Sequence, residues 1–223
     1  MVSLLDIIGP VMVGPSSSHT AGACRLGLLA RGLVNGTPQS ALLELHGSFA
    51  RTGEGHGTDK ALVAGLMGFR PDDERIRTAL EIAEHEGLDY RFEKTSLSDS
   101  SHPNTVRMSL ERGDIKATLV GSSLGAGRVL VTNIDGYPVE VDGNFHTIAL
   151  VAEDKKGSIA RITGILAEHE INIATLALTR KQKGGDAFMV IECDDPPGEA
   201  VRDELRGLGW VRWARRLDKV SGG

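Results

Sequence analysis

The chain has 223 residues, which is enough for one large domain or two small ones. Hydrophobic residues make up 40% and charged residues 25%, values typical of a globular chain with a buried core. The formal net charge of −5 argues against broad binding to nucleic acid or to an anionic membrane, because both favour a basic patch. The sequence also lacks an apolar run near the roughly 20 residues of a membrane span and the basic start of a secretory signal, so we expect a cytoplasmic protein.

Glycine and cysteine are the two unusual features of the composition. The chain has 28 glycines but only five Phe, two Trp and two Tyr. A high glycine content suits a backbone that lies close to a ligand, because glycine has no side chain in the way. The two cysteines, Cys24 and Cys193, are far apart in the sequence and form no paired motif. This count argues against a disulfide framework, a four-cysteine zinc site and a self-sufficient iron–sulfur cluster, and favours two buried free thiols.

The first half of the chain predicts a mixture of helices and strands. Helices are expected over 20–35, ended by Gly36 as a left-handed cap, over 58–67, and after the acidic start at 71–74. A glycine-rich loop is expected after the first strand. Strands are expected at 41–45, 88–94, 105–111, 115–120, 128–134 and 137–142. Tight hairpins are expected at Gly113-Asp114 and Asp135-Gly136.

From residue 144 the pattern becomes strand, helix, strand, strand, helix, strand, which is the ferredoxin-like order. On the strand expected at 171–178, one face should carry Ile171, Ile173, Thr175 and Ala177. The predicted fold class is α+β. An N-terminal mixed α/β domain over 1–143 would bind a substrate or effector, and a βαββαβ domain would follow over 144–223.

The first stretch that suggests chemistry is Gly14-Pro-Ser-Ser-Ser-His-Thr20. Its hydroxyl residues stand directly before a predicted helix, whose positive end suits a carboxylate or phosphate. A single hydroxyl there would be an ordinary helix cap. Four hydroxyls and the imidazole of His19 exceed what capping requires, so we favour a ligand site. The hydroxyl residues are Ser16, Ser17, Ser18 and Thr20.

The second stretch runs from 45 to 59 and contains His56 between two glycines. Flanking glycines leave the imidazole accessible as a general base, although a lone histidine in such a loop is more often only a surface residue. Arg51 and Lys60 can pair with a substrate carboxylate or remain solvated.

The third stretch is Ser100-Ser-His-Pro-Asn-Thr105, where Pro103 favours a turn and Asn104 can donate and accept hydrogen bonds. Taken alone it is an ordinary turn. Together with the other two stretches it suggests that His19, His56 and His102 converge on one cleft. A metal site formed by these histidines is disfavoured, because the spacing of carboxylates and cysteines does not support one.

The segment Gly121–Gly127 resembles a phosphate-binding loop only superficially. It lacks the lysine of a P-loop and precedes an expected strand rather than a helix. A glycine-permitted turn that lines the same cleft is the favoured interpretation.

These motifs together resemble the β chain of iron–sulfur-dependent L-serine dehydratase, over essentially the whole chain. The first half resembles that family's β domain, which is similar to the intervening domain of some phosphoglycerate dehydrogenases. The second half resembles an ACT domain. The segments that carry the resemblance are 14–22, 47–59, 101–106, 121–125, Asp154-Lys-Lys-Gly-Ser-Ile159 and Ile171-Asn-Ile-Ala-Thr175.

The resemblance implies that L-serine is dehydrated to pyruvate and ammonia with a [4Fe-4S] cluster. In this family the cluster is held by a separate alpha chain, so this chain would be inactive alone and would supply no metal ligand. The implied partners are that L-serine dehydratase alpha chain, L-serine, and further copies of this chain through either domain. Neither nucleic acid nor a membrane is expected as a partner.

The same resemblance gives the histidines a role. A base must remove the α-proton of serine, and an imidazole suits this role near neutral pH. We expect His56 to be the base or its close partner, with His19 and His102 completing the cleft. The expected ligands of the substrate's carboxylate or ammonium group are Ser16, Ser17, Ser18, Thr20 and Asn104.

Two alternatives remain open from the sequence. The chain could be a non-catalytic regulatory or scaffold subunit that binds serine, another small amino acid or an anion as effector. The ACT half could bind an effector or could serve assembly alone through edge strands. A dehydrogenase is disfavoured, because no G-x-G-x-x-G lies in a βαβ context. The residues that match the effector turn of ACT domains are Asp154, Gly157, Ser158 and Asn172.

Overall fold

The computed structural model describes residues 11–97, 101–180 and 182–221. The chain divides into two compact units, one reaching Gly143 and the other running from Asn144 to Lys219. The end of the chain returns to the first unit, because the backbone N–H groups of Val220 and Ser221 donate to the Gly143 carbonyl at 2.9 and 3.1 Å. Within the described residues, no helix has the length and apolar character needed to cross a membrane.

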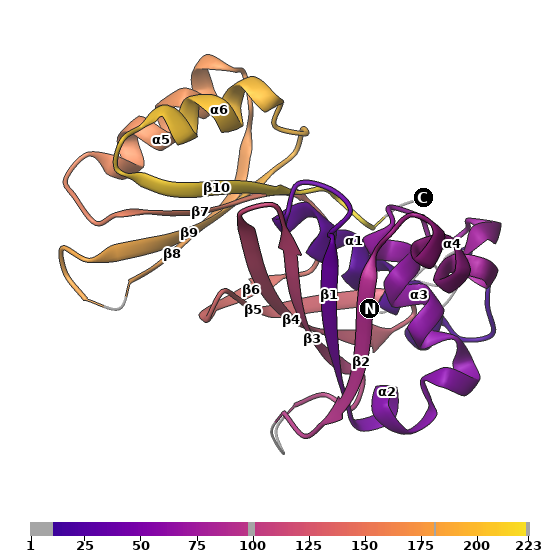
Figure 1. The fold of residues 1–223 in the computed structure, drawn as a ribbon. Helices are drawn as coiled ribbons and strands as arrows, with labels where there is room; N and C mark the ends of the chain where they lie inside the picture. The colour runs from indigo at the N-terminus through magenta and orange to yellow at the C-terminus, as the bar shows by residue number, and fades with distance from the viewer. Residues whose placement is uncertain (1–10, 98–100, 181, 222–223) are drawn as a thin grey trace, which may run out of the picture. The chain divides into compact units, whose positions relative to one another are not determined.

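In the described part of the first unit, six strands form one sheet in the order β2-β1-β3-β4-β5-β6 (Figure 1). The first two strands in this order, β2 and β1, run parallel to each other. The other neighbouring strands are antiparallel. The hairpins expected at Gly113 and Gly136 are confirmed, and both glycines have positive φ. The strands are β1 (Ser40–His46), β2 (Asp89–Thr95), β3 (Thr105–Arg112), β4 (Ile115–Gly125), β5 (Arg128–Ile134) and β6 (Tyr137–Val141).

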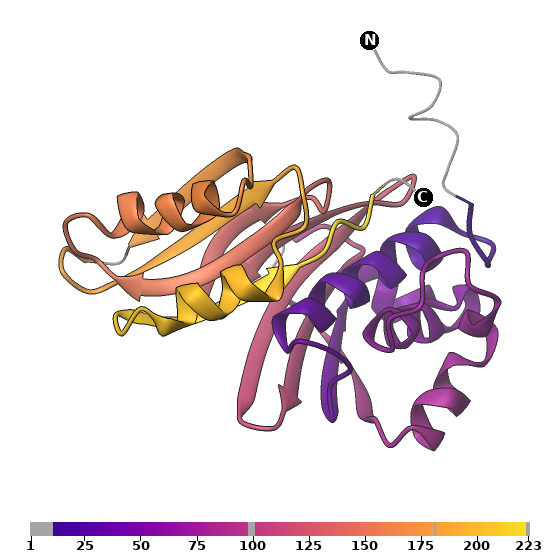
Figure 2. The same ribbon diagram turned by 90° about the horizontal axis from the view of Figure 1, so that it is seen from above.

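Three helices cover one face of this sheet, as Figures 1 and 2 show: α1 (Ala23–Leu33), α3 (Thr58–Leu66) and α4 (Ala79–His85). Residues of β1 alternate between buried and half-buried, as expected for a sheet with one covered face. Helices α1 and α3 approach each other backbone to backbone at two glycines. A Cβ atom on Gly65 would collide with the Cys24 carbonyl oxygen, so only glycine permits this packing.

The helix predicted over 20–35 begins earlier and differs in type. A π-helix, η2 (Ser17–Gly22), leads directly into α1. At its end Asn35 takes the left-handed conformation with φ +58°, whereas Gly36, the predicted cap, has φ +137°. Asparagine tolerates this conformation, which explains why the turn is one residue early. The acidic start at 71–74 leads into a 3₁₀ helix, η4 (Glu74–Thr78), before α4.

Two segments predicted as glycine-rich loops are regular structure. Residues 47–56 form a short helix, α2 (Gly47–Thr52), and a 3₁₀ turn, η3 (Glu54–His56). Phe49 anchors α2, because its side chain is almost fully buried. Residues 121–125 extend β4, where they pair with β5 through two register shifts, so that the turn is confined to Ala126 and Gly127.

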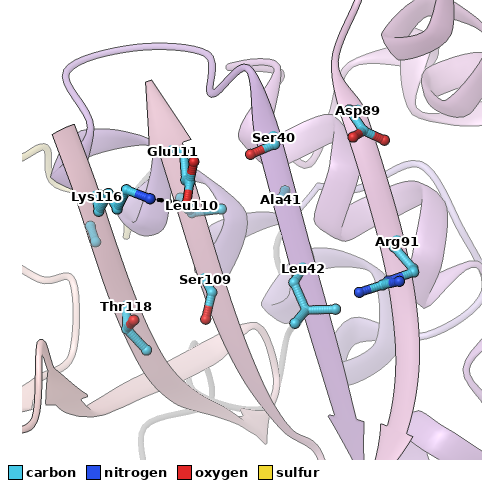
Figure 3. A pocket seen from close by; sticks show the side chains of 11 residues that line it. Ser40, Ala41, Leu42, Asp89, Arg91, Ser109, Leu110, Glu111, Lys116 and Thr118 are labelled. Atoms are coloured by element: carbon cyan, nitrogen blue, oxygen red, sulfur yellow. Dashed lines mark hydrogen bonds and ion pairs between the residues drawn. The ribbon is translucent and has the colours of Figure 1, made fainter. Parts of the chain in front are cut away.

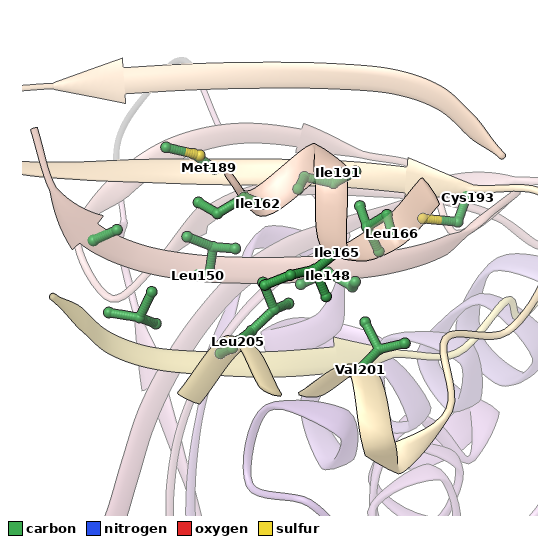
Figure 4. Packing of buried hydrophobic residues seen from close by; sticks show 13 residues of the cluster. Ile148, Leu150, Ile162, Ile165, Leu166, Met189, Ile191, Cys193, Val201 and Leu205 are labelled. Atoms are coloured by element: carbon green, nitrogen blue, oxygen red, sulfur yellow. The ribbon is translucent and has the colours of Figure 1, made fainter. Parts of the chain in front are cut away.

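The second unit confirms the βαββαβ order. Its described strands form one antiparallel sheet in the order β10-β7-β9-β8, with α5 (Ser158–Glu168) and α6 (Glu199–Gly207) over one face (Figure 1). The core lies between these helices and the sheet, where Leu150, Ile162 and Leu205 are buried (Figure 4). The strands are β7 (His146–Glu153), β8 (Ile173–Arg180), β9 (Asp186–Cys193) and β10 (Val211–Leu217).

The predicted shared face is confirmed for Ile171 and Ile173, which both pack against the core, but is wrong for Thr175 and Ala177. The strand begins at Ile173 and its register against β9 shifts between Ile173 and Thr175, which breaks the alternation of faces. As a result Ile173 and Leu176 pack against the core, whereas Thr175 and Ala177 are exposed.

Candidate functional site

The serine-rich stretch serves partly as a helix cap. Ser16 caps η2, because its Oγ accepts the His19 N–H at 3.2 Å. Ser16 therefore acts as an ordinary helix cap. A π-helical turn is rare and is frequently found at functional sites. Here it turns the His19 side chain inward, leaving the residue 9% exposed.

Hydroxyl groups face both ring nitrogens of His19. Its Nδ1 lies 3.2 Å from Ser18 Oγ and 3.5 Å from Ser16 Oγ. Its Nε2 lies 3.3 Å from Ser48 Oγ and 3.4 Å from Thr52 Oγ1. Because a hydroxyl can donate or accept, either neutral tautomer of His19 is satisfied.

Ser48 and Thr52 are site residues that the sequence analysis missed. They stand four positions apart on α2 and therefore share one helix face. A pair of hydroxyls at helical spacing beside a histidine was the available signal, but the glycines around it favoured a loop.

The environment of His19 favours its neutral form. Burial lowers the pKa of His19 below its ordinary value, and the neighbouring His56 lowers it further. The two imidazole rings lie 5.0 Å apart between centroids, and Phe49 contacts His19 edge-on at 5.4 Å. We therefore assign His19 as neutral at pH 7.

His56 is exposed and has a defined proton position. Its Nδ1 lies 2.9 Å from the Thr52 carbonyl oxygen, which can only accept, so Nδ1 carries the proton. In the neutral ring the lone pair is then on Nε2, where it can accept a proton. Thr20 is almost fully buried and donates from Oγ1 to the His56 carbonyl at 3.4 Å. Thr20 thus supports the His56 backbone.

The third stretch joins the second through its backbone. The Pro103 carbonyl accepts the N–H of Ser48 at 2.6 Å and of Phe49 at 3.4 Å, and so caps α2. His102 Nδ1 accepts the Asn104 N–H at 3.1 Å, which places the proton of the neutral ring on Nε2. The neutral His102 can therefore donate a hydrogen bond from Nε2. It cannot act as a base there, because its Nδ1 lone pair already accepts the Asn104 N–H.

Asn104 connects this stretch to the end of β4. Its carbonyl accepts the Ser123 N–H at 2.9 Å, and its Nδ2 donates to the Ser123 carbonyl at 3.5 Å. The Ser123 Oγ is buried without a hydrogen-bond partner in the described residues and lies against Gly22 of η2. The segments singled out from the sequence thus adjoin one another. Of the residues predicted from the sequence, the direct side-chain cluster contains His19, His56, Ser16 and Ser18, to which Ser48 and Thr52 are added, while Ser17 is half-buried.

The cysteines do not fit an iron–sulfur cluster. Both are buried and free, as predicted, and they lie in different units. Cys24 donates from Sγ to the Phe69 carbonyl at 3.1 Å. Burial raises the pKa of Cys24 to about 12 and that of Cys193 to about 11. Two cysteines are also fewer than the four that hold a [4Fe-4S] cluster. Among the described residues, no group of three or more His, Cys, Asp or Glu is arranged to hold a metal ion.

A groove of about 560 Å³ lies on the sheet face opposite the helices (Figure 3). Its walls come from β1 to β4 and include Ser40, Arg91 and the Lys116–Glu111 ion pair at 2.7 Å. None of the candidate residues from the sequence lines it. The groove is therefore separate from the histidine cluster.

The four candidate effector residues of the second unit do not form one cluster within this chain. Asp154 follows β7 and accepts from Arg180 at 2.7 Å and from the Gly184 N–H at 3.0 Å. These bonds lower the pKa of Asp154. Gly157 and Ser158 begin α5 nearby. Asn172 instead pairs with Asp194 beyond the far end of β9. Asp194 is eight residues beyond Asp186, the partner of Glu153, so the separation is about 26 Å along a strand that rises about 3.3 Å per residue.

Two family models match this chain, one in each half. The ACT domain family matches residues 146–209, which identifies this half as an ACT domain. The serine dehydratase beta chain family matches residues 3–87. A "Probable L-serine dehydratase, beta chain" from Bacillus subtilis (strain 168) is 42% identical, over 92% of this chain and 93% of that protein. The "L-serine dehydratase, beta chain" of Peptoniphilus asaccharolyticus is 39% identical over the same shares.

The chain therefore belongs to the family of serine dehydratase beta chains. "L-serine dehydratase 2" of Escherichia coli (strain K12) is 27% identical, over 77% of this chain and 43% of that protein. The resemblance drawn from the motifs and the α+β fold class are confirmed. Membership favours a subunit of a lyase over the purely regulatory alternative.

Proposed function

We propose that this chain and a separate alpha chain together convert L-serine to pyruvate and ammonia. The beta-chain names of the two most similar relatives described above support a division between two subunits. The longer Escherichia coli relative also supports it, because this chain matches only 43% of that protein. In this proposal the alpha chain holds the [4Fe-4S] cluster, since the two buried thiols here are unsuited to ligate one.

His56 acts as the general base in this proposal. Loss of water from serine requires removal of the Cα proton and departure of the β-hydroxyl, and the resulting aminoacrylate hydrolyses to pyruvate and ammonia. The observation that carries the assignment is the hydrogen bond from His56 Nδ1 to the Thr52 carbonyl, which leaves the exposed Nε2 to take the proton. His19, being neutral, does not repel the imidazolium that forms.

The other residues of the cluster bind and orient in this proposal. Ser18, together with Ser16 and Ser17, offers hydroxyls to the substrate carboxylate. His102 donates from Nε2, which suits an anionic group of the substrate. Asn104 and Thr20 hold the segments that carry these groups, because both are bonded to neighbouring backbone.

The ACT half binds a small amino acid as effector in the same proposal, with the turn at Asp154, Gly157 and Ser158 as the contact region. The Asp154 carboxylate is already bonded to Arg180 and Gly184, so it would orient this turn. Asn172 would then contribute from a second copy of the chain, since it lies at the other end of the sheet. Calorimetric titration of the chain with L-serine tests this, and absence of heat at millimolar serine would leave assembly as the role of this half.

The division of labour is tested by co-purification. The two chains, purified together and separately under anaerobic conditions, should form pyruvate from L-serine only when both are present. Full activity from this chain alone would contradict the proposal. Replacing His56 by Ala in the assembled enzyme should abolish most turnover, and unchanged turnover would remove His56 from the mechanism.

A further inference from the structure

A second hollow lies beside α2, on a different side from the His19 cluster. It has a volume of about 530 Å³, within the range of small-molecule pockets. The residues that line it are His46, Gly47, Ala50, Arg51, Lys94, Thr95 and Ser96. We call it the α2 groove.

Among the described residues, the lining of the α2 groove offers cations and hydrogen-bond donors and includes no carboxylate. Arg51 and Lys94 are both exposed, and neither has a carboxylate partner within the described part of the chain. His46 accepts the Leu97 N–H at its Nδ1, at 3.3 Å, so its neutral ring carries the proton on Nε2. Thr95 and Ser96 add two hydroxyls.

Three cations on β2, β3 and β4 have carboxylate partners. The Nε of Arg91 lies 3.2 Å from Oε1 of Glu93, and Nη1 of Arg107 lies 3.3 Å from Oε1 of Glu44. Lys116 lies 2.7 Å from Glu111. Arg112 on β3 instead donates to the Asn35 carbonyl at 2.8 Å. The two cations of the α2 groove share one hollow and have no carboxylate partner among the described residues. Two such charges close together repel, and an anion between them relieves the repulsion.

The groove also has a favourable position in the fold. It lies at the carboxyl ends of β1 and β2, where His46 is in register with Thr95. These two strands are parallel, and β1 has an antiparallel neighbour on its other side. In open α/β sheets, ligands commonly bind outside the carboxyl ends of parallel strands, and β1 and β2 are the parallel pair of this sheet.

We propose that the α2 groove binds a small ligand through a phosphate or carboxylate group held between Arg51 and Lys94. The site is separate from the histidine cluster, so it does not depend on the proposed catalytic role. It shares α2 with that cluster, because Ser48 and Thr52 contact His19 while Ala50 and Arg51 line the groove.

The test is titration of the ¹⁵N-labelled full chain with inorganic phosphate and, separately, with acetate, followed by amide chemical shifts. One or both anions should shift the amides of 46–51 and 94–96. The double variant Arg51→Glu/Lys94→Glu should lower the affinity at least about tenfold. Lys219→Glu makes the same kind of charge change on an exposed residue of the second unit and should alter affinity less than about twofold.

Several results would overturn the proposal. These are amide shifts spread over all basic residues, an equal loss of affinity in Lys219→Glu, or no amide shift in the groove with either anion. A double variant that leaves anion affinity unchanged but prevents assembly with the alpha chain would instead assign the groove to an acidic partner segment. If the double variant fails to fold, Arg51→Gln/Lys94→Gln should still weaken binding, and its failure to do so contradicts the site.

Discussion

The imidazole rings of His19 and His56 lie 5.0 Å apart between centroids, with their planes inclined by 39°. One ring is buried among hydroxyls and favours the neutral form, while the other is exposed with its Nδ1 fixed by a carbonyl. In the proposed mechanism the two rings have separate tasks: His19 remains neutral while His56 takes up the Cα proton of the substrate.

The pKa of His19 predicts a pH dependence of stability. Because its pKa is lower in the folded chain than the ordinary 6.5, the unfolded chain binds more protons just below that pH. The contribution is present above about pH 6.5 and is lost as the pH falls toward the folded pKa. Hydrogen exchange of the α1 amides should show decreasing stability from pH 7 to pH 5, with a weaker decrease in His19→Gln.

The control for this prediction is His85→Gln, since the His85 side chain is 88% exposed. It should keep the wild-type pH dependence. An identical pH dependence in His19→Gln and the wild type would show that His19 does not titrate differently in the folded state.

The hydroxyls on α2 should hold the His19 ring in place. Thr52→Val and Ser48→Ala each remove a group near Nε2, and each should lower the free energy of unfolding of the first unit by about 0.5–1.5 kcal/mol. They should also broaden the His19 ring resonances, because the ring loses a fixed partner. Thr163→Val is the matched control: Thr163 likewise donates to the carbonyl four residues before it, but on α5. A Thr52 effect no larger than that of Thr163 would contradict this role.

The contact between Gly22 and Ser123 should position η2 on β4. A Cβ atom at residue 22 would collide with the Ser123 hydroxyl, so Gly22→Ala should destabilise the first unit by about 1–3 kcal/mol. Ser123→Gly should relieve the collision, and the double variant should recover at least about 1 kcal/mol relative to Gly22→Ala. Chemical denaturation monitored by exchange of the α1 amides measures each value. Additive effects of the two substitutions would mean that the residues are not in contact.

Local patterns predicted the order of elements well. The periodicity of 144–217 was sufficient for the ACT half, and Gly113 and Gly136 marked true hairpins. Tertiary partners decided the remaining features. The Pro103 carbonyl caps α2 and Phe49 buries it, so the glycine-rich stretch forms a helix despite its composition.

The candidate site was predicted only in part, because tertiary contacts complete it. Residue types marked His19 and His56, but only the folded chain brings their rings together and adds Ser48 and Thr52. The proton positions of His56 and His102 depend on a carbonyl and an amide from the local fold. The sequence contains no sign of either bond.

The most direct test of the proposed mechanism is the kcat of His56→Gln in the enzyme assembled with its alpha chain. The variant keeps a polar side chain but cannot accept the Cα proton as imidazole does. The account predicts that kcat falls by about 10²–10⁴-fold, while His85→Gln leaves kcat within about twofold. A kcat for His56→Gln within about twofold of the wild-type value would contradict the central claim.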